Sequence, residues 1–144
     1  MIEQDTIKLL RECDAGIQMG VMSIDAVADH VHSRGLRKYL NDCKAQHNKL
    51  KKEIDTMLDI FHDDGKAPNP VARGMAHIRT SARIMLDSSD KTIADLITDG
   101  CNMGVKSLNR YLNQYEAADE RSKDIAKRLI GMEEKLVKEI RHFL

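Results

Sequence analysis

Four long stretches of the chain place apolar residues at alternating steps of three and four, the spacing of one face of an α-helix. They run over residues 9–31, 36–61, 93–115 and 126–143, and the second is the most regular of them. Charged residues fill many of the positions in between. Each stretch therefore predicts a long amphipathic helix with one face toward a core.

Breaks in this pattern group the four stretches into two helical hairpins. Ser33-Arg34-Gly35 separates the first pair, and Asp63-Asp64-Gly65 ends the second stretch, with Gly65 placed as its C-terminal stop. Candidate N-caps for the third and fourth helices are Ser89 or Asp90, and Asp119 or Ser122.

The connection between the hairpins, residues 65–88, predicts a short helix of its own. Asn69 followed by Pro70 is a good N-cap and first helical residue, and the helix is expected to run from about Pro70 to Leu86. Its apolar positions are Val71, Met75, Ile78, Ala82 and Met85. The chain is thus expected to be a single domain, 1–144, made of a hairpin (1–64), a crossover (65–88) and a second hairpin (89–144).

The two hairpins resemble each other in sequence. An offset of 84 aligns Gly16, Met19, Gly20, Val21 and Ser23 with Gly100, Met103, Gly104, Val105 and Ser107. An offset of 86 aligns Lys49, Leu50, Lys52, Glu53 and Ile54 with Lys135, Leu136, Lys138, Glu139 and Ile140. The two-residue change falls in the hairpin turn, where insertions are tolerated. A duplicated hairpin predicts an all-α, pseudo-two-fold four-helix bundle, which the crossover is long enough to span at roughly 40 Å.

Composition excludes several classes of protein. The 144 residues contain 23 basic and 23 acidic side chains, and this zero net charge argues against a nucleic-acid binder that works through bulk positive charge. No apolar run reaches the length of a membrane span or a signal peptide. Three widely spaced cysteines suit reduced thiols, so we expect a cytoplasmic protein.

Two polar residues stand on the predicted apolar faces and carry the candidate chemistry. His47 lies on the second helix, and the repeat aligns it with Glu133 on the fourth. They form either a remnant site for one metal ion or a proton, or a buried hydrogen-bonded pair that sets helix register; two ligands are too few for a closed metal site, which favours the pair. A soft-metal alternative adds Cys13, Cys43 and Met103 to His47.

Four glycines inside the predicted helices need a cause, because each costs about 1 kcal/mol relative to alanine. Gly16 and Gly20 on the first helix correspond to Gly100 and Gly104 on the third. They form either a face where the two backbones pack closely or a cavity for a ligand. Close packing is the favoured interpretation.

The helical pattern with its polar positions resembles the ferritin-like superfamily, closest to its uncharacterised bacterial domains of unknown function. The residues that carry the resemblance are Leu9, Leu10, Cys13–Gly16, Leu36, Tyr39, Leu40, His47, Leu50, Glu53, Ile54, Ala94–Gly100, Ser107, Leu108 and Tyr111. The resemblance implies a four-helix bundle with one long crossover. It also implies a homodimer that pairs through helix faces.

The resemblance further implies what this chain lacks. Di-iron members offer one glutamate from each of two helices and Glu-x-x-His from each of the other two. Carried over, the single-glutamate positions fall on Gly16 and Gly100, and the paired motifs become Lys44-x-x-His47 and Ile130-x-x-Glu133. We therefore expect a binding or interaction module without a di-iron site, rather than an enzyme. The alternative is a protein that binds a single metal ion through His47 and Glu133 with nearby Cys or Met.

Overall fold

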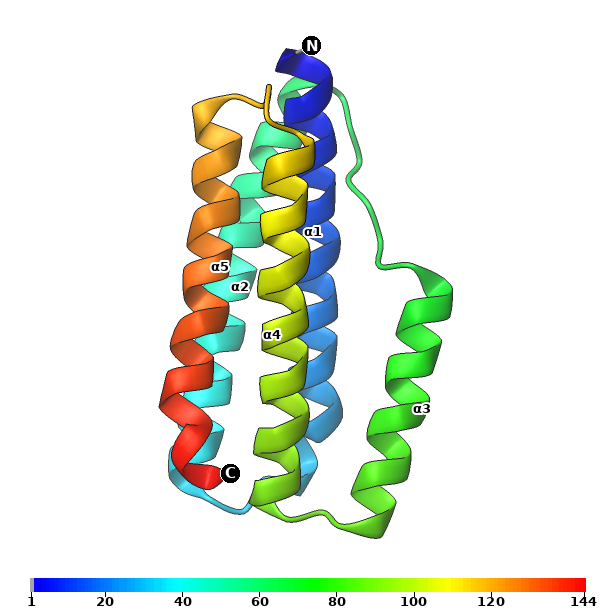
Figure 1. Ribbon diagram of the computed structural model, residues 1–144, viewed down its shortest axis with the longest axis vertical. Helices are drawn as coiled ribbons and strands as arrows, with labels where there is room; N and C mark the ends of the chain where they lie inside the picture. Colours follow the sequence, from blue (N-terminus) through cyan, green and yellow to red (C-terminus); the bar gives the residue numbers. More distant parts are fainter. Residues whose placement is uncertain (1) are drawn as a thin grey trace.

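The computed structural model describes residues 2–144, apart from the side chains of residues 71, 72, 75, 77 and 78. It is an all-α bundle of four long helices with a shorter helix between two hairpins, as the sequence predicts (Figure 1). The helices are α1 (Ile2–Val27), α2 (Arg34–Ile60), α3 (Pro70–Leu86), α4 (Asp90–Gln114) and α5 (Glu120–Ile140), with single 3₁₀ turns at η1 (Ala28–His30) and η2 (Arg141–Phe143).

The crossover determines how the two hairpins combine. Figure 1 shows α1 running down and α2 running up, after which the crossover and α3 return along the outside of the bundle to the start of α4. Helix α1 packs against α2 and α4, and α5 packs against α4 and α2. Each long helix is therefore antiparallel to both of its neighbours, and the two chain termini lie at opposite ends of the bundle.

Side-chain caps begin three of the long helices. Ser33 accepts from the Leu36 amide, Ser89 from the Thr92 amide and Asp119 from the Ser122 amide, which satisfies amide groups that have no partner within the helix. This selects Ser89 and Asp119 from the candidate caps.

The predicted end of α2 needs correction. The helix stops at Ile60, and His62 already adopts a left-handed backbone with a φ of 56°. Gly65 lies several residues beyond the helix end, so it is not its stop. Its positive φ of +88° serves a contact with α1 that is described below.

The buried apolar side chains form two clusters, one toward each end of the bundle. The members of the first include Leu9, Leu10, Cys13, Ile17, Leu50, Ile54, Leu58, Ile125 and Leu129. The members of the second include Ile24, Val27, Leu36, Leu40, Cys43, Ile93, Ile97, Cys101, Leu136 and Ile140. The level between the two clusters holds polar residues.

Among the described side chains of helix α3, two arginines form ion pairs with α4. Arg79 pairs with Asp99 at 3.1 Å and Arg83 with Asp95 at 2.8 Å. Of the predicted apolar face, Val71, Met75 and Ile78 lie outside the described residues, whereas Ala82 and Met85 are exposed, so that part of the prediction is wrong. Ile84 packs against the second cluster instead.

Within residues 2–144, none of the helices is long and apolar enough to cross a membrane.

Candidate functional site

The level between the two apolar clusters is occupied by an imidazole and a carboxylate that bond directly. His47 of α2 and Glu133 of α5 approach to 2.8 Å between Nε2 and Oε1. The His47 side chain is 1% exposed and that of Glu133 is 12% exposed. The structure thus brings together the two residues that the sequence repeat pairs.

The other ring nitrogen fixes the state of the imidazole. His47 Nδ1 lies 2.8 Å from the backbone oxygen of Cys43 and 3.5 Å from its Sγ. A carbonyl oxygen only accepts hydrogen bonds, so we assign a proton to Nδ1. Nε2 and Glu133 then hold one further proton between them, and the pair is neutral overall wherever that proton resides.

Burial and hydrogen bonding act in opposite directions on His47. Burial by itself lowers the pKa of the imidazole, whereas the hydrogen bonds to Cys43 and Glu133 outweigh burial and raise this pKa to about 10. At neutral pH, the bundle interior therefore contains an imidazolium paired with a carboxylate.

Two of the four predicted glycines make room for this pair. A Cβ added at Gly20 would lie 3.1 Å from His47 Nε2, and one added at Gly104 would lie 3.7 Å from Glu133 Oε2. Neither would meet the backbone of the other helix, so the favoured interpretation of close packing between α1 and α4 is wrong. The space is filled by the imidazole and the carboxylate.

The other two glycines do not belong to the site. Gly16 and Gly100 are exposed. A Cβ added at Gly16 would meet only Leu129, at 3.9 Å, and a Cβ added at Gly100 would meet no atom within 4 Å. Ile17, one position after Gly16, occupies the core side of α1. The positions that face the pair are thus Gly20 and Gly104, one turn beyond those expected from the resemblance.

The three cysteines lie in different surroundings. Cys43 contacts His47, and Cys101 lies beside Glu133; burial, followed by the charge of Glu133, raises the pKa of the Cys101 thiol. Cys13 lies in the first apolar cluster, seven residues or roughly 10 Å along α1 from Gly20. Burial and then the charge of Glu12 raise its pKa to about 12. The structure does not bring Cys13 to the pair, which overturns its place in the predicted soft-metal set, and Met103 is 64% exposed.

The residues at this level do not fit a dinuclear iron centre. Such a centre uses four carboxylates and two imidazoles that all project inward, whereas this level offers Glu133 and His47, already bonded to each other. Lys44 pairs with Asp25 at the surface, and Ile130 belongs to the first apolar cluster. Among the described side chains, no three His, Cys, Asp or Glu residues form a group that could hold a metal ion.

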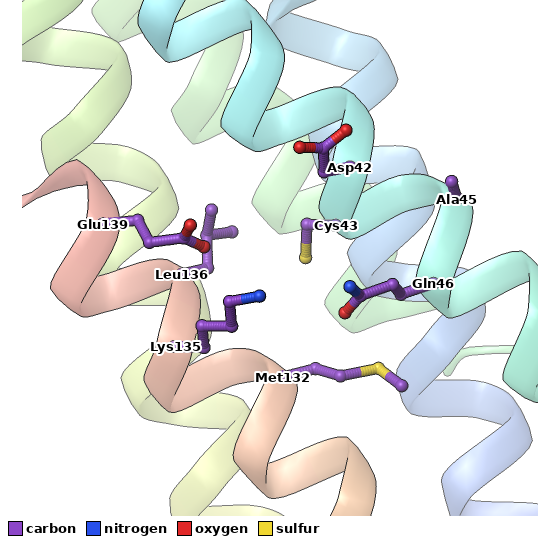
Figure 2. A pocket seen from close by; sticks show the side chains of 8 residues that line it. All are labelled: Asp42, Cys43, Ala45, Gln46, Met132, Lys135, Leu136 and Glu139. Atoms are coloured by element: carbon purple, nitrogen blue, oxygen red, sulfur yellow. The ribbon is translucent and has the colours of Figure 1, made fainter.

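A surface groove between α2 and α5 has Cys43, the neighbour of His47, in its lining. Figure 2 shows Cys43 among the side chains that line it, with the Lys135 amine extending into the space between the two helices. The complete lining is Asp42, Cys43, Ala45, Gln46, Met132, Lys135, Leu136 and Glu139. The groove therefore borders Cys43, whereas the imidazole behind it stays buried.

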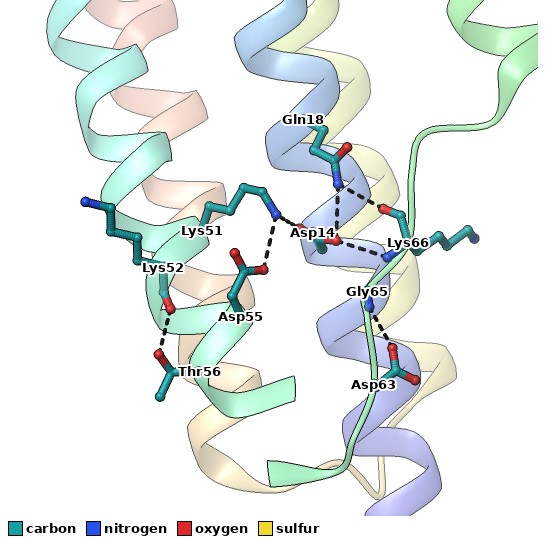
Figure 3. Close-up of polar contacts among 9 residues, drawn as sticks. All are labelled: Asp14, Gln18, Lys51, Lys52, Asp55, Thr56, Asp63, Gly65 and Lys66. Atoms are coloured by element: carbon teal, nitrogen blue, oxygen red, sulfur yellow. Dashed lines mark hydrogen bonds and ion pairs between the residues drawn. The ribbon is translucent and has the colours of Figure 1, made fainter. Parts of the chain in front are cut away.

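A second buried polar group, Asp14, was missed by the sequence reasoning. It is 1% exposed and accepts from Lys51 Nζ at 2.8 Å, the Lys66 amide at 3.0 Å and Gln18 Nε2 at 3.1 Å (Figure 3). A Cβ at Gly65 would overlap Asp14 Oδ2, so glycine is required there both by space and by its positive φ. The sequence did contain a signal for this buried carboxylate, because Asp14 is an acidic residue next to Cys13 on the apolar face of the helix.

These contacts give Asp14 a structural role. Gly65 and Lys66 begin the crossover, and Asp14 holds them against α1. Arg11 reinforces this attachment through a 3.1 Å ion pair with Asp63. The cluster fixes the path by which the chain leaves the first hairpin.

Comparison of the chain with protein-family models, curated proteins and solved structures finds no match.

Proposed function

We propose that this chain is a ferritin-like helical bundle that acts as a binding or interaction module, with a buried His–Glu pair in place of a dinuclear metal centre. Two antiparallel hairpins joined by one long crossover support the ferritin-like assignment (Figure 1). The sequence resemblance supports it independently.

One observation supports the absence of a dinuclear metal centre from this proposal. His47 and Glu133 bond directly at 2.8 Å, and Gly20 and Gly104 face this pair. The two glycines leave room for the imidazole and the carboxylate and offer no ligand of their own. The remaining imidazole and carboxylate satisfy each other's hydrogen bonds. Such a pair fixes the alignment of α2 and α5. The bundle then has a defined shape, which a partner can contact on the surface.

Iron loading tests this proposal. The purified chain is incubated aerobically with excess Fe²⁺, desalted and analysed for metal by elemental analysis. We expect iron far below one atom per chain and the same content in His47→Ala. Two iron atoms per chain, lost in His47→Ala, would overturn the proposal.

A second copy of the chain is the partner that the resemblance suggests first. Sedimentation velocity over a hundredfold range of concentration tests this, and we expect a dimer that dissociates on dilution. A monomer at every concentration would direct the search to a different protein partner.

The competing function is a single metal site, which would have to recruit the Cys43 and Cys101 thiols that lie beside the pair but do not form a metal-binding group with it among the described side chains. Thiolate, imidazole and carboxylate together suit zinc and its analogue cobalt. Co²⁺ titration monitored by visible absorption separates the two functions. We expect no tetrahedral cobalt bands; bands that saturate at one equivalent and disappear in His47→Ala would establish the metal site.

A further inference from the structure

A thiol, an imidazole and a carboxylate are connected in series from the surface groove into the bundle. Cys43 Sγ lies 3.5 Å from His47 Nδ1, and His47 Nε2 lies 2.8 Å from Glu133 Oε1. This is a potential nucleophile beside a protonated imidazole, which a carboxylate in turn orients. Because Nδ1 carries a proton beside the sulfur, it stabilises negative charge that develops there.

The groove makes Cys43 the reachable thiol. Cys43 is 9% exposed, compared with 4% for Cys101 and 0% for Cys13. The groove has a volume of about 270 Å³, just below the roughly 300 Å³ at which ligand pockets begin, so it can hold a small group or one end of a larger molecule. Cys43 and Cys101 both belong to the second apolar cluster and Cys13 to the first, but of the three cysteines it is Cys43 that lines the groove.

Side chains around Cys43 offer both signs of charge. Lys135 extends into the groove, Gln46 adds an amide, and Asp42 and Glu139 supply carboxylates (Figure 2). An amine and carboxylates in one small groove suit a molecule that carries both a carboxylate and an ammonium group.

We propose that Cys43 is a thiol-exchange site for low-molecular-weight disulfides of the amino-acid or short-peptide type. The Cys43 sulfur attacks one sulfur of the disulfide, a new S–S bond forms and the original S–S bond breaks. Cys43 is oxidised to the mixed disulfide and the departing sulfur is reduced. The proton lost from Cys43 is balanced by the proton that the departing thiolate takes up.

The first test is selectivity in the folded protein. The native chain is incubated with oxidised glutathione and examined by intact mass and peptide mapping. We expect one adduct per chain, on Cys43, which is absent in Cys43→Ser and retained in Cys101→Ala. In urea all three cysteines should react. No adduct in the folded protein, or one spread over the three thiols, would overturn the proposal.

The second test concerns the two residues behind the thiol. In His47→Gln the rate of mixed-disulfide formation should fall at least tenfold while circular dichroism still shows a folded helical protein. An unchanged rate would overturn the contribution of the imidazole. Glu133→Gln should give a smaller fall, because it retains a hydrogen bond to His47 but loses the charge.

The third test concerns recognition of charge. In Lys135→Ala the rate with oxidised glutathione should fall severalfold, whereas the rate with the neutral 2-hydroxyethyl disulfide should stay constant. Equal effects on both reagents would show that the groove does not select charged disulfides.

Discussion

The first hairpin buries Asp14 under three hydrogen-bond donors, whereas the second hairpin has Thr98 at the position that the 84-residue offset aligns with it. Among the described side chains that are not exposed, the Thr98 hydroxyl is the one buried oxygen without a hydrogen-bond partner. Lys51, the charged partner of Asp14, corresponds through the 86-residue offset to Val137. Two helical hairpins of similar sequence thus differ in the polarity of equivalent positions, which lie toward opposite ends of the bundle.

The crossover accounts for this difference. It leaves the first hairpin as an irregular segment whose backbone amides need acceptors, and Asp14 supplies one to Lys66. It reaches the second hairpin as the regular helix α3, whose backbone is already bonded, so exposed ion pairs such as Arg83–Asp95 are sufficient. The irregular backbone requires a buried acceptor and the helix does not.

The two hairpins also differ at the level between the apolar clusters, where one contributes His47 and the other Glu133. The repeat places His47 and Glu133 opposite each other, where two imidazolium groups or two carboxylates would repel. Gly20 and Gly104 stay identical because each only has to leave room. Pairing across the pseudo-two-fold axis therefore requires unlike side chains on α2 and α5 and permits like residues on α1 and α4.

Removing one member of the central pair should have the largest effect. Glu133→Ala leaves the buried imidazole without its carboxylate, and we expect a loss of about 3–5 kcal/mol in the free energy of unfolding. Urea unfolding followed by circular dichroism measures this loss.

The matched control replaces both members. The double variant His47→Leu with Glu133→Leu fills the level with apolar side chains and should lie within about 1 kcal/mol of the wild type or be more stable. If the double variant is as unstable as Glu133→Ala, the His47–Glu133 pair must stabilise the folded state by more than it costs to bury its two polar groups.

The second largest effect should come from the first hairpin and be absent at the aligned position of the second. Asp14→Ala leaves the Lys66 amide without an acceptor and removes one of the two acceptors of Gln18, and we expect a loss of about 2 kcal/mol together with faster proteolysis in residues 61–69. Thr98→Ala, at the aligned position, should stay within about 0.5 kcal/mol of the wild type, because its hydroxyl makes no bond. Similar losses in both variants would contradict the assigned asymmetry.

The fold could be predicted from the sequence because helix faces, caps and turns are local signals. The spacing of Leu36, Leu40 and Leu50 gave the helix, and Ser89 and Asp119 gave starts that the structure confirms. The pairing of His47 with Glu133 followed from the duplication, which relates distant residues through a symmetry visible in one chain.

Other features depend on contacts between segments that no local pattern encodes. Asp14 is bonded by residues 37 and 52 positions away, and Gly65 is fixed by a side chain of α1 rather than by the helix that precedes it. Gly16 and Gly20 lie one turn apart on nearly the same side of α1, so the choice between them depends on height along the bundle, which the apolar pattern does not specify.

The raised pKa of His47 predicts how stability depends on pH. Because the folded pKa is about 10 and the ordinary value is 6.5, the stabilisation is complete below pH 6.5 and is lost as pH rises toward 10. Unfolding free energies measured between pH 6.5 and 8.5 should fall by about 1 kcal/mol per pH unit from this group. This range ends below the ordinary pKa of 9.0 of the thiols. His47→Gln should remove the slope, and an equal slope in the variant would assign it to other groups.

The smallest effect should distinguish the glycines that face the pair from those that do not. Gly100→Ala adds a Cβ that meets nothing within 4 Å, so the higher helix propensity of alanine should stabilise the protein by about 1 kcal/mol. In Gly20→Ala the Cβ lies 3.1 Å from His47 Nε2, and the ring cannot move away without lengthening its bond to Glu133. We expect this strain to exceed the gain in propensity and to give a net loss of about 1 kcal/mol. Thermal unfolding of the two variants side by side measures the difference, and stabilisation of both would mean that the glycine on α1 is not needed to seat the imidazole.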